Sequence, residues 1–178
     1  MLFAADNRMH DVEGGMTGGA NCPLIGAPAH DQVSGDCAAP NATHVTLVAG
    51  RVEGVVRQFW PNGNSQLLAA FVDGQPHGEM RVFNEDGVIT MRASYQSGLL
   101  HGPCLQLVHG QTVSILTYQQ GKLHGNALCF DQVSARAVAL FHYENGLLHG
   151  WTRYWRPDGS PLRDEKWHAG VLQFVEER

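Results

Sequence analysis

The chain has 178 residues, and its 12 lysines and arginines against 17 aspartates and glutamates give a formal net charge of −5. This acidic balance argues against nucleic acid and anionic membrane surfaces as partners, and no apolar stretch reaches transmembrane length. At this length we expect one structural domain and a tail. Residues 1–16 lack the features of a signal peptide, so we expect a cytoplasmic protein, or a periplasmic or secreted one if the chain is a processed form.

Residues 1–44 differ in composition from the rest of the chain. They contain two Gly-Gly pairs, three prolines and few apolar runs. Such a segment is typical of a tail or an irregular cap, and a cap would cover the open edge that a repeat sheet otherwise exposes. Cys22 and Cys37 lie in this segment, and they would form a disulfide only in an oxidising compartment.

Residues 45–172 are dominated by a repeat. The dipeptide His-Gly occurs at 77–78, 101–102, 124–125 and 149–150, at intervals of 24, 23 and 25 residues. Another glycine lies four positions before the glycine of each dipeptide, and an aromatic residue lies three positions before that first glycine. The same spacing of residues recurs upstream, where Glu53 takes the place of the histidine, and downstream, at Trp167 and Gly170. A fixed period near 24 indicates five full units and a partial sixth, followed by a C-terminal tail at 173–178.

Each unit is predicted to contain two short strands and two turns. Asn-Gly and Asp-Gly signals mark the turns, and the fourth unit has Ser134-Ala135 where others have a glycine, so its turn should be longer or looser. The units should form one continuous antiparallel meander. The expected strands are 54–60, 65–72, 78–84, 89–96, 102–108, 112–119, 125–131, 137–144, 150–156 and 161–168.

Two columns of large side chains follow from the repeat, and we expect both to pack on one face of the sheet as its main stabiliser. The first column is aromatic, and the second lies five residues after each repeat glycine. The first comprises Phe71, Tyr95, Tyr118, Tyr143 and Trp167, and the second Phe59, Phe83, Leu107, Phe130 and Trp155.

The fifth unit carries a family resemblance. Its segment 143–151, YENGLLHGW, followed by Tyr154-Trp155-Arg156-Pro157-Asp158-Gly159, resembles the variant MORN repeat of bacterial YwqK-type antitoxins. The resemblance covers the repeat region and implies an all-β fold, an elongated, twisted single-layer antiparallel sheet of tandem hairpins. For function it implies an antitoxin, an immunity protein, a scaffold or a membrane-associated module.

The repeat glycines are structural candidates. We expect each to stand where a side chain or a negative φ is not tolerated. They are Gly54, Gly78, Gly102, Gly125 and Gly150.

No catalytic or metal-binding pattern stands out. The repeated histidines should lie one hairpin apart, about 9–10 Å, which is too far for two of them to share a zinc ion easily. We therefore expect turn histidines that hydrogen-bond backbone, with a pH-sensing ladder as the alternative. Cys104 and Cys129 are interpreted as small buried residues. We expect no enzyme activity, no metal and no cofactor.

A candidate partner surface combines arginine with tryptophan. Strand alternation places Trp151, Arg153 and Trp155 on one face, with Arg57 and Arg81 further up the array. Arginine and tryptophan are typical of protein interfaces; the alternative interpretation is a solvated face on which arginine stems cover aromatic rings.

We expect a non-enzymatic protein-binding module of the antitoxin or immunity kind, which occludes a basic toxin or effector. The alternatives are a scaffold that self-associates or links partners, and a membrane-associated module, which the acidic balance disfavours.

Overall fold

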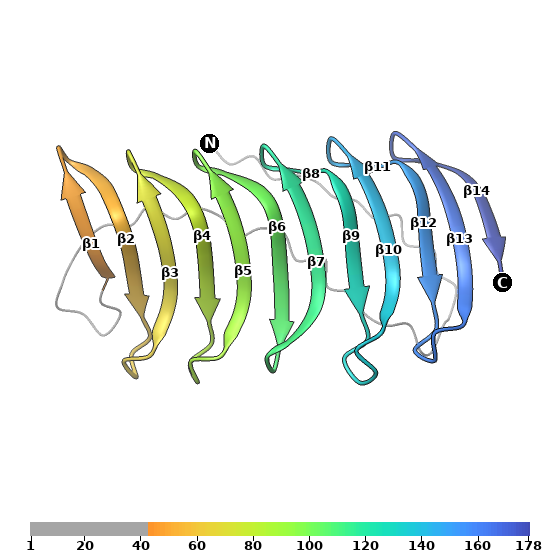
Figure 1. Cartoon of the computed structure of the whole chain (residues 1–178), viewed down its shortest axis with the longest axis horizontal. Coiled ribbons are helices and arrows are strands. Elements are labelled where there is room, and N and C mark those ends of the chain that lie inside the picture. The colour runs from red at the N-terminus through yellow and green to blue at the C-terminus, as the bar shows by residue number, and fades with distance from the viewer. Residues whose placement is uncertain (1–42) are drawn as a thin grey trace.

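The protein is all-β, and its strands form a single open antiparallel sheet (Figure 1). The computed structural model describes residues 43–178, and no helix occurs in that range. Apart from the two-residue strands β8 and β11, which pair with β7 and β10, each strand lies beside the next one in the chain, so the sheet is one long row of hairpins. The strands are β1 (Thr43–Val48), β2 (Arg51–Phe59), β3 (Ser65–Val72), β4 (Gln75–Phe83), β5 (Ile89–Gln96), β6 (Leu99–Val108), β7 (Gln111–Gln119), β8 (Lys122–Leu123), β9 (Gly125–Phe130), β10 (Ala137–Glu144), β11 (Leu147–Leu148), β12 (Gly150–Trp155), β13 (Pro161–His168) and β14 (Val171–Glu177).

This architecture confirms the expected hairpin array, with differences at its ends. The expected strands at 65–72, 89–96, 137–144 and 161–168 coincide with β3, β5, β10 and β13. Four strands were not expected: β1 and β14 at the two ends of the array, and the two-residue strands β8 and β11 inside it. The boundaries drawn at 44 and 172 therefore fall inside strands, and most of the proposed C-terminal tail pairs with β13. The remainder of the N-terminal segment, with Cys22 and Cys37, lies outside the described residues.

Tight turns form one long edge of the sheet, which we call the His-Gly edge. Each turn has two residues, both with positive φ, which is the type I′ geometry that matches the twist of a hairpin. The first residue is not glycine at any of them, and its φ lies between 47° and 52°. The turns are Ala49-Gly50, Asp73-Gly74, Ser97-Gly98, Gln120-Gly121, Asn145-Gly146 and Ala169-Gly170.

The opposite edge carries longer loops, except between β6 and β7, where His109-Gly110 form another two-residue turn with φ 49° and 79°. Residues 60–64, 84–88 and 156–160 connect strands in the same way, each with a glycine at positive φ. The fourth unit needs one residue more, 131–136, and holds Ala135 at φ 55°. The Asp131 carboxylate organises this longer loop by accepting hydrogen bonds from the Ser134 backbone N–H at 2.7 Å and from its hydroxyl at 2.8 Å.

The glycine of each His-Gly pair lies at an irregularity in the strand pairing. From Tyr95 to Ala93 β5 advances by two residues, while the opposite segment of β6, from Leu100 to Cys104, advances by four. Gly102 lies inside that segment with φ 91°. A Cβ built at Gly102 would meet its nearest atom, the Ser94 Cβ, at an ordinary 3.7 Å. Backbone conformation, and not lack of space, is therefore what requires glycine here. The φ of all five repeat glycines lies between 81° and 92°.

Consecutive units are joined by a ladder of backbone hydrogen bonds along the His-Gly edge. In every turn after the first, the second residue donates its N–H to a carbonyl of the preceding unit, two residues after that unit's own turn glycine. The five rungs run from Gly74 to Val52 (2.9 Å), Gly98 to Pro76 (2.9 Å), Gly121 to Leu100 (2.8 Å), Gly146 to Leu123 (2.7 Å) and Gly170 to Leu148 (2.8 Å). Each unit is thus bonded mainly to its neighbours, as in other repeat proteins.

The main hydrophobic core lies on one face, which we call the core face. Tyr95 pairs with Gly78 across the strands, and paired residues share a face, so the ring can cover a position that has no side chain. The buried cluster on this face contains Ala69, Met80, Ala93, Tyr95, Leu100, Cys104, Leu116, Ala127 and Tyr143, with Phe71 and Tyr118 packed against it.

The second column of large side chains does not join this core, which corrects the expectation that both columns share one face. Phe83 follows Gly78 by five positions, an odd number, so strand alternation turns it to the opposite face. None of the five residues of that column belongs to the main cluster, and all five are half-buried. We call their face the outer face.

Candidate functional site

One row of side chains crosses the outer face of the sheet from end to end. Each member pairs directly with the next, so all of them share that face. We call this set the transverse row. In order from β2 to β13 it comprises Arg57, Leu68, Arg81, Arg92, Leu105, Ile115, Leu128, Leu140, Arg153 and Asp164.

The transverse row has a basic end, an aliphatic middle and a mixed end. Four consecutive aliphatic members, from Leu105 on β6 to Leu140 on β10, are half-buried. Arg57 and Arg92 at the first end are exposed, and neither has an ion-pair partner among residues 43–178. Neighbouring aliphatic and cationic groups on an exposed sheet face can take up both apolar and acidic groups of a ligand.

At the basic end, Arg81 and Arg92 lie directly opposite each other on β4 and β5. Like charges at such a pair repel. Glu79 offsets this repulsion by accepting two hydrogen bonds from Arg81, Nε to Oε1 at 2.8 Å and Nη2 to Oε2 at 2.9 Å. These bonds, supported by the charges of Arg81 and Arg92, lower the pKa of Glu79, although partial burial opposes them. Arg92 itself keeps no carboxylate partner in the described chain.

At the other end lie three of the residues predicted from the sequence. Trp151, Arg153 and Trp155 alternate along β12, and Arg153 pairs with Asp164. Trp151 is exposed, lies edge-on to Phe174 of β14 with ring centroids 6.3 Å apart, and has the Lys166 Nζ 5.7 Å from its ring centroid. Trp155 is half-buried and belongs to neither core cluster of the described residues.

The predicted residues therefore form two groups and not one. Arg57 and Arg81 are two strands apart, about 10 Å at the usual strand spacing. Arg153 lies six strands beyond Arg81, or roughly 29 Å. The aliphatic middle of the transverse row connects them. Arg92, a member of the basic group, was missed because it lies on the other strand of its hairpin from the repeated arginine position.

The acidic residues are distributed differently from the arginines. Residues 43–178 hold 12 of the 17 acidic residues and 11 of the 12 basic ones, so this range carries −1 and residues 1–42 carry −4. Within the array, Glu85, Asp86, Asp131 and Asp158 lie in the loops opposite the His-Gly edge. The acidity of the whole chain is thus no guide to the charge of the outer face.

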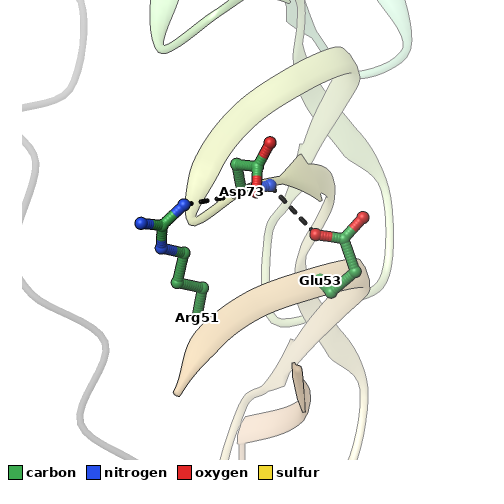
Figure 2. Close-up of polar contacts among 3 residues, drawn as sticks. All are labelled: Arg51, Glu53 and Asp73. Atoms are coloured by element: carbon green, nitrogen blue, oxygen red, sulfur yellow. Dashed lines mark hydrogen bonds and ion pairs between the residues drawn. The ribbon is translucent and has the colours of Figure 1, made fainter. Parts of the chain in front are cut away.

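The histidine positions of the repeat lie at the His-Gly edge, and in the first two units the side chain there contacts the next turn. In the first unit Glu53 holds this position, and its Oε2 accepts the Asp73 backbone N–H at 2.9 Å (Figure 2). Arg51 pairs with the Asp73 carboxylate at 3.4 Å across the same turn. In the second unit the His77 Nδ1 accepts the Ser97 N–H at 3.4 Å. The histidine can therefore serve as an acceptor for the first turn residue, as glutamate does.

Histidines do approach one another at the end of the array. The rings of His149 and His168 have centroids 4.9 Å apart, and the Glu144 Oε2 lies 3.4 Å from the His149 Nδ1. No group of three or more His, Cys, Asp or Glu side chains in residues 43–178 is arranged to hold a metal ion. Cys104 and Cys129 are both buried.

A buried carboxylate that the sequence analysis missed closes the core face at its C-terminal end. Glu165 is only 6% exposed and pairs with Thr152 at a position where earlier units have Ala69 and Ala93. Its Oε2 accepts hydrogen bonds from the Trp167 indole at 3.0 Å and the Tyr154 hydroxyl at 3.3 Å, and its Oε1 pairs with Arg163 at 2.9 Å. Aligning the repeat units would have shown a carboxylate at a core position.

No protein-family model matches the chain, and no curated protein matches it. The resemblance to the variant MORN repeat therefore rests on the motif residues themselves. Within residues 43–178 no helix is long and apolar enough to cross a membrane.

Proposed function

We propose that this chain is a non-catalytic protein-binding module that holds a protein partner against its outer face. The observation that carries the proposal is the transverse row, in which arginines flank a continuous aliphatic stripe. Exposed Trp151 and half-buried Trp155 add aromatic surface beside Arg153. Aromatic residues and arginine are the side chains that most often anchor protein interfaces.

The repeat motif supports an antitoxin or immunity role, in which the array would cover the active site of a toxin by steric occlusion. A sheet held by successive hairpins and inter-unit hydrogen bonds offers a broad, preorganised surface, so little ordering is needed on binding. At the transverse row such a partner would present apolar side chains to the middle. Its carboxylates would meet Arg57 and Arg92.

A basic partner, which the net charge of the whole chain favours, would bind elsewhere on the array. Its cations would be met by the loops opposite the His-Gly edge, which carry Glu85 and Asp86 in one loop and Asp158 in another. The two binding modes predict different sensitive residues, so one set of variants separates them.

The experiment is an affinity pull-down from the native cell with the full chain, followed by affinity measurement on whatever protein co-purifies. Arg92→Glu and Arg153→Glu should each weaken binding, by roughly 2 kcal/mol where the residue is an anchor. Arg51→Glu is the matched control, because Arg51 lies at the His-Gly edge away from the transverse row. Loss of binding with Asp86→Lys, but not with the arginine variants, would move the site to the loops. A well-folded Arg92→Glu, Arg153→Glu double variant with full affinity would overturn the proposal.

A scaffold role is the second candidate, and one observation favours it. In the described part of the chain, β1 and β14 each pair on one side only, so the array has two open ends.

A further inference from the structure

The two ends of the array are complementary to each other. Inside the array every turn glycine donates its N–H to the unit before it, and a carbonyl two residues after every turn glycine accepts from the unit after it. Within the described residues, one backbone N–H at the first turn and one backbone carbonyl at the last turn take no part in this ladder. The donor is the Gly50 N–H in the first turn, and the acceptor is the Leu172 carbonyl just after the last turn.

Leu172 has the same position as the internal acceptors. It follows Gly170 by two residues and pairs with Trp167, as Leu148 follows Gly146 and pairs with Tyr143. The Leu148 carbonyl accepts from the next unit, so the same register points the Leu172 carbonyl to the open side of β14.

Within the described residues, no further unit covers the apolar side chains at the two ends of the array, and several of them are exposed. Leu172 is 43% exposed, whereas Leu100 at the equivalent position inside the array is 7% exposed. Val175 pairs with Glu165, as Met80 pairs with Ala69, and it is 42% exposed while Met80 is buried. Leu47 and Val48 of β1 are exposed at the other end.

The charges of the transverse row are also complementary at the two ends. Beyond Asp164 the row continues to Glu176 on β14, and beyond Arg57 it continues to His44 on β1. Arg178 balances part of this acidic end, since its Nη2 lies 3.1 Å from Asp164 and 3.3 Å from Glu176. If β1 of a second chain followed β14 in the register that β3 has after β2, with Gly50 bonded to Leu172 as Gly74 is to Val52, Glu177 would pair with His44 of that chain and Glu176 would lie one position away.

We propose that the protein associates head to tail with further copies of itself, with β14 of one copy pairing with β1 of the next. Gly50 of the second copy would then donate to Leu172 of the first, which adds a rung to the same ladder. The exposed end residues become internal positions of a longer sheet. Contacts of this kind do not close on themselves, so the product is an open chain of copies. This proposal does not depend on the proposed binding role of the outer face.

The test is sedimentation velocity on the full chain over a series of concentrations. The native protein should show species larger than a monomer that grow with concentration. Val175→Lys blocks the β14 end and Leu47→Lys blocks the β1 end, so each protein alone should stay monomeric. Mixing the two should give a dimer and nothing larger, because each supplies the one end that the other has lost. Val133→Lys, in the 131–136 loop with Val133 94% exposed, is the control and should still grow.

Other results would overturn the proposal. A native protein that stays monomeric at every concentration excludes it. A dimer that survives Leu47→Lys but not Val175→Lys would show two β14 edges pairing with each other instead. Because an edge substitution could impair folding, circular dichroism of each variant is compared with that of the native chain. Glu176→Lys tests the contribution of charge to the same contact. It should raise the protein concentration needed for association by roughly tenfold or more.

Discussion

Arg81 and Arg92 lie directly opposite each other on neighbouring strands of an otherwise weakly charged sheet. A sheet gains stability from cross-strand pairs, and a pair of like charges works against it. Glu79 balances Arg81 through two hydrogen bonds, while Arg92 has no ion-pair partner in the described chain. An unfavourable pair on an exposed face is more readily explained by what binds there than by the fold.

Replacing Arg92 by leucine, the residue type of Leu105 at the next position of the row, should therefore raise the unfolding midpoint and weaken partner binding. The gain follows from removing repulsion with Arg81, and the loss from removing a cation of the proposed site. Chemical denaturation and binding affinity are measured on the same protein. Arg51→Leu is the comparison, because Arg51 pairs with Asp73 and lies off the row. Unchanged affinity in Arg92→Leu would argue that the arginine pair has no part in binding.

Glu165 is expected to be the most sensitive charged residue of the array. Glu165→Ala removes the acceptor of the Tyr154 hydroxyl and the Trp167 indole and leaves Arg163 without its carboxylate. We expect a loss of roughly 3 kcal/mol in the free energy of unfolding, which is the lower end of the range for breaking a buried ion pair. The lower end applies because the Arg163 side chain is a third exposed. Tyr154→Phe, which removes a single hydrogen bond, should cost about 1 kcal/mol. Urea denaturation measures the free energy of unfolding of both variants. An equal loss for Glu165→Ala and Tyr154→Phe would contradict this prediction.

The repeat frame predicts the strands well because glycine and turn residues recur at fixed offsets, and β3, β5, β10 and β13 match it to the residue. The face of the sheet on which a side chain lies is predicted less well. Phe83 lies an odd number of positions after Gly78, and that parity alone places it away from Tyr95. Strand β14 was missed because it belongs to the partial sixth unit, and β1 was missed because the expected strands began only at Gly54. Arg92 became a member of the site only through its pairing with Arg81, which requires the register of the hairpin.

The first residue of each tight turn also predicts a change in stability. Gln120 adopts φ 50°, a conformation that costs most residues energy but that asparagine tolerates, and Asn145 has the same conformation at φ 52° in the next turn. Gln120→Asn should raise the free energy of unfolding by roughly 0.5–1 kcal/mol, and Asn145→Gln should lower it by a similar amount. Thermal denaturation of the two reciprocal variants measures both. Shifts of the same sign would show that side-chain contacts, and not φ, decide the preference.

Two half-buried tyrosines, Tyr118 and Tyr154, predict instability in alkali. Burial raises the pKa of Tyr118 from 10.0 to about 12, with a smaller contribution from Cys104, and burial together with Glu165 raises the pKa of Tyr154 to about 12. A raised pKa means that the fold favours the neutral phenol. The contribution to stability is therefore complete below pH 10 and is lost as pH rises towards 12. Unfolding midpoints measured across this range should fall, and they should fall less steeply for Tyr118→Phe. An identical slope in that variant would rule out a contribution from Tyr118.

The repeat glycines allow conformation to be separated from space. Gly102 has φ 91°, and the nearest atom to a Cβ placed there is at an ordinary contact distance of 3.7 Å. Gly102→Ala should therefore already lose most of the expected 1–3 kcal/mol of unfolding free energy, and Gly102→Val should lose little more. Gly102→Asn should lose less than either, because asparagine tolerates positive φ better. A valine variant far less stable than the alanine variant would mean that crowding against Ser94 sets the requirement. A melting temperature unchanged in all three variants would show that the fold does not need this glycine.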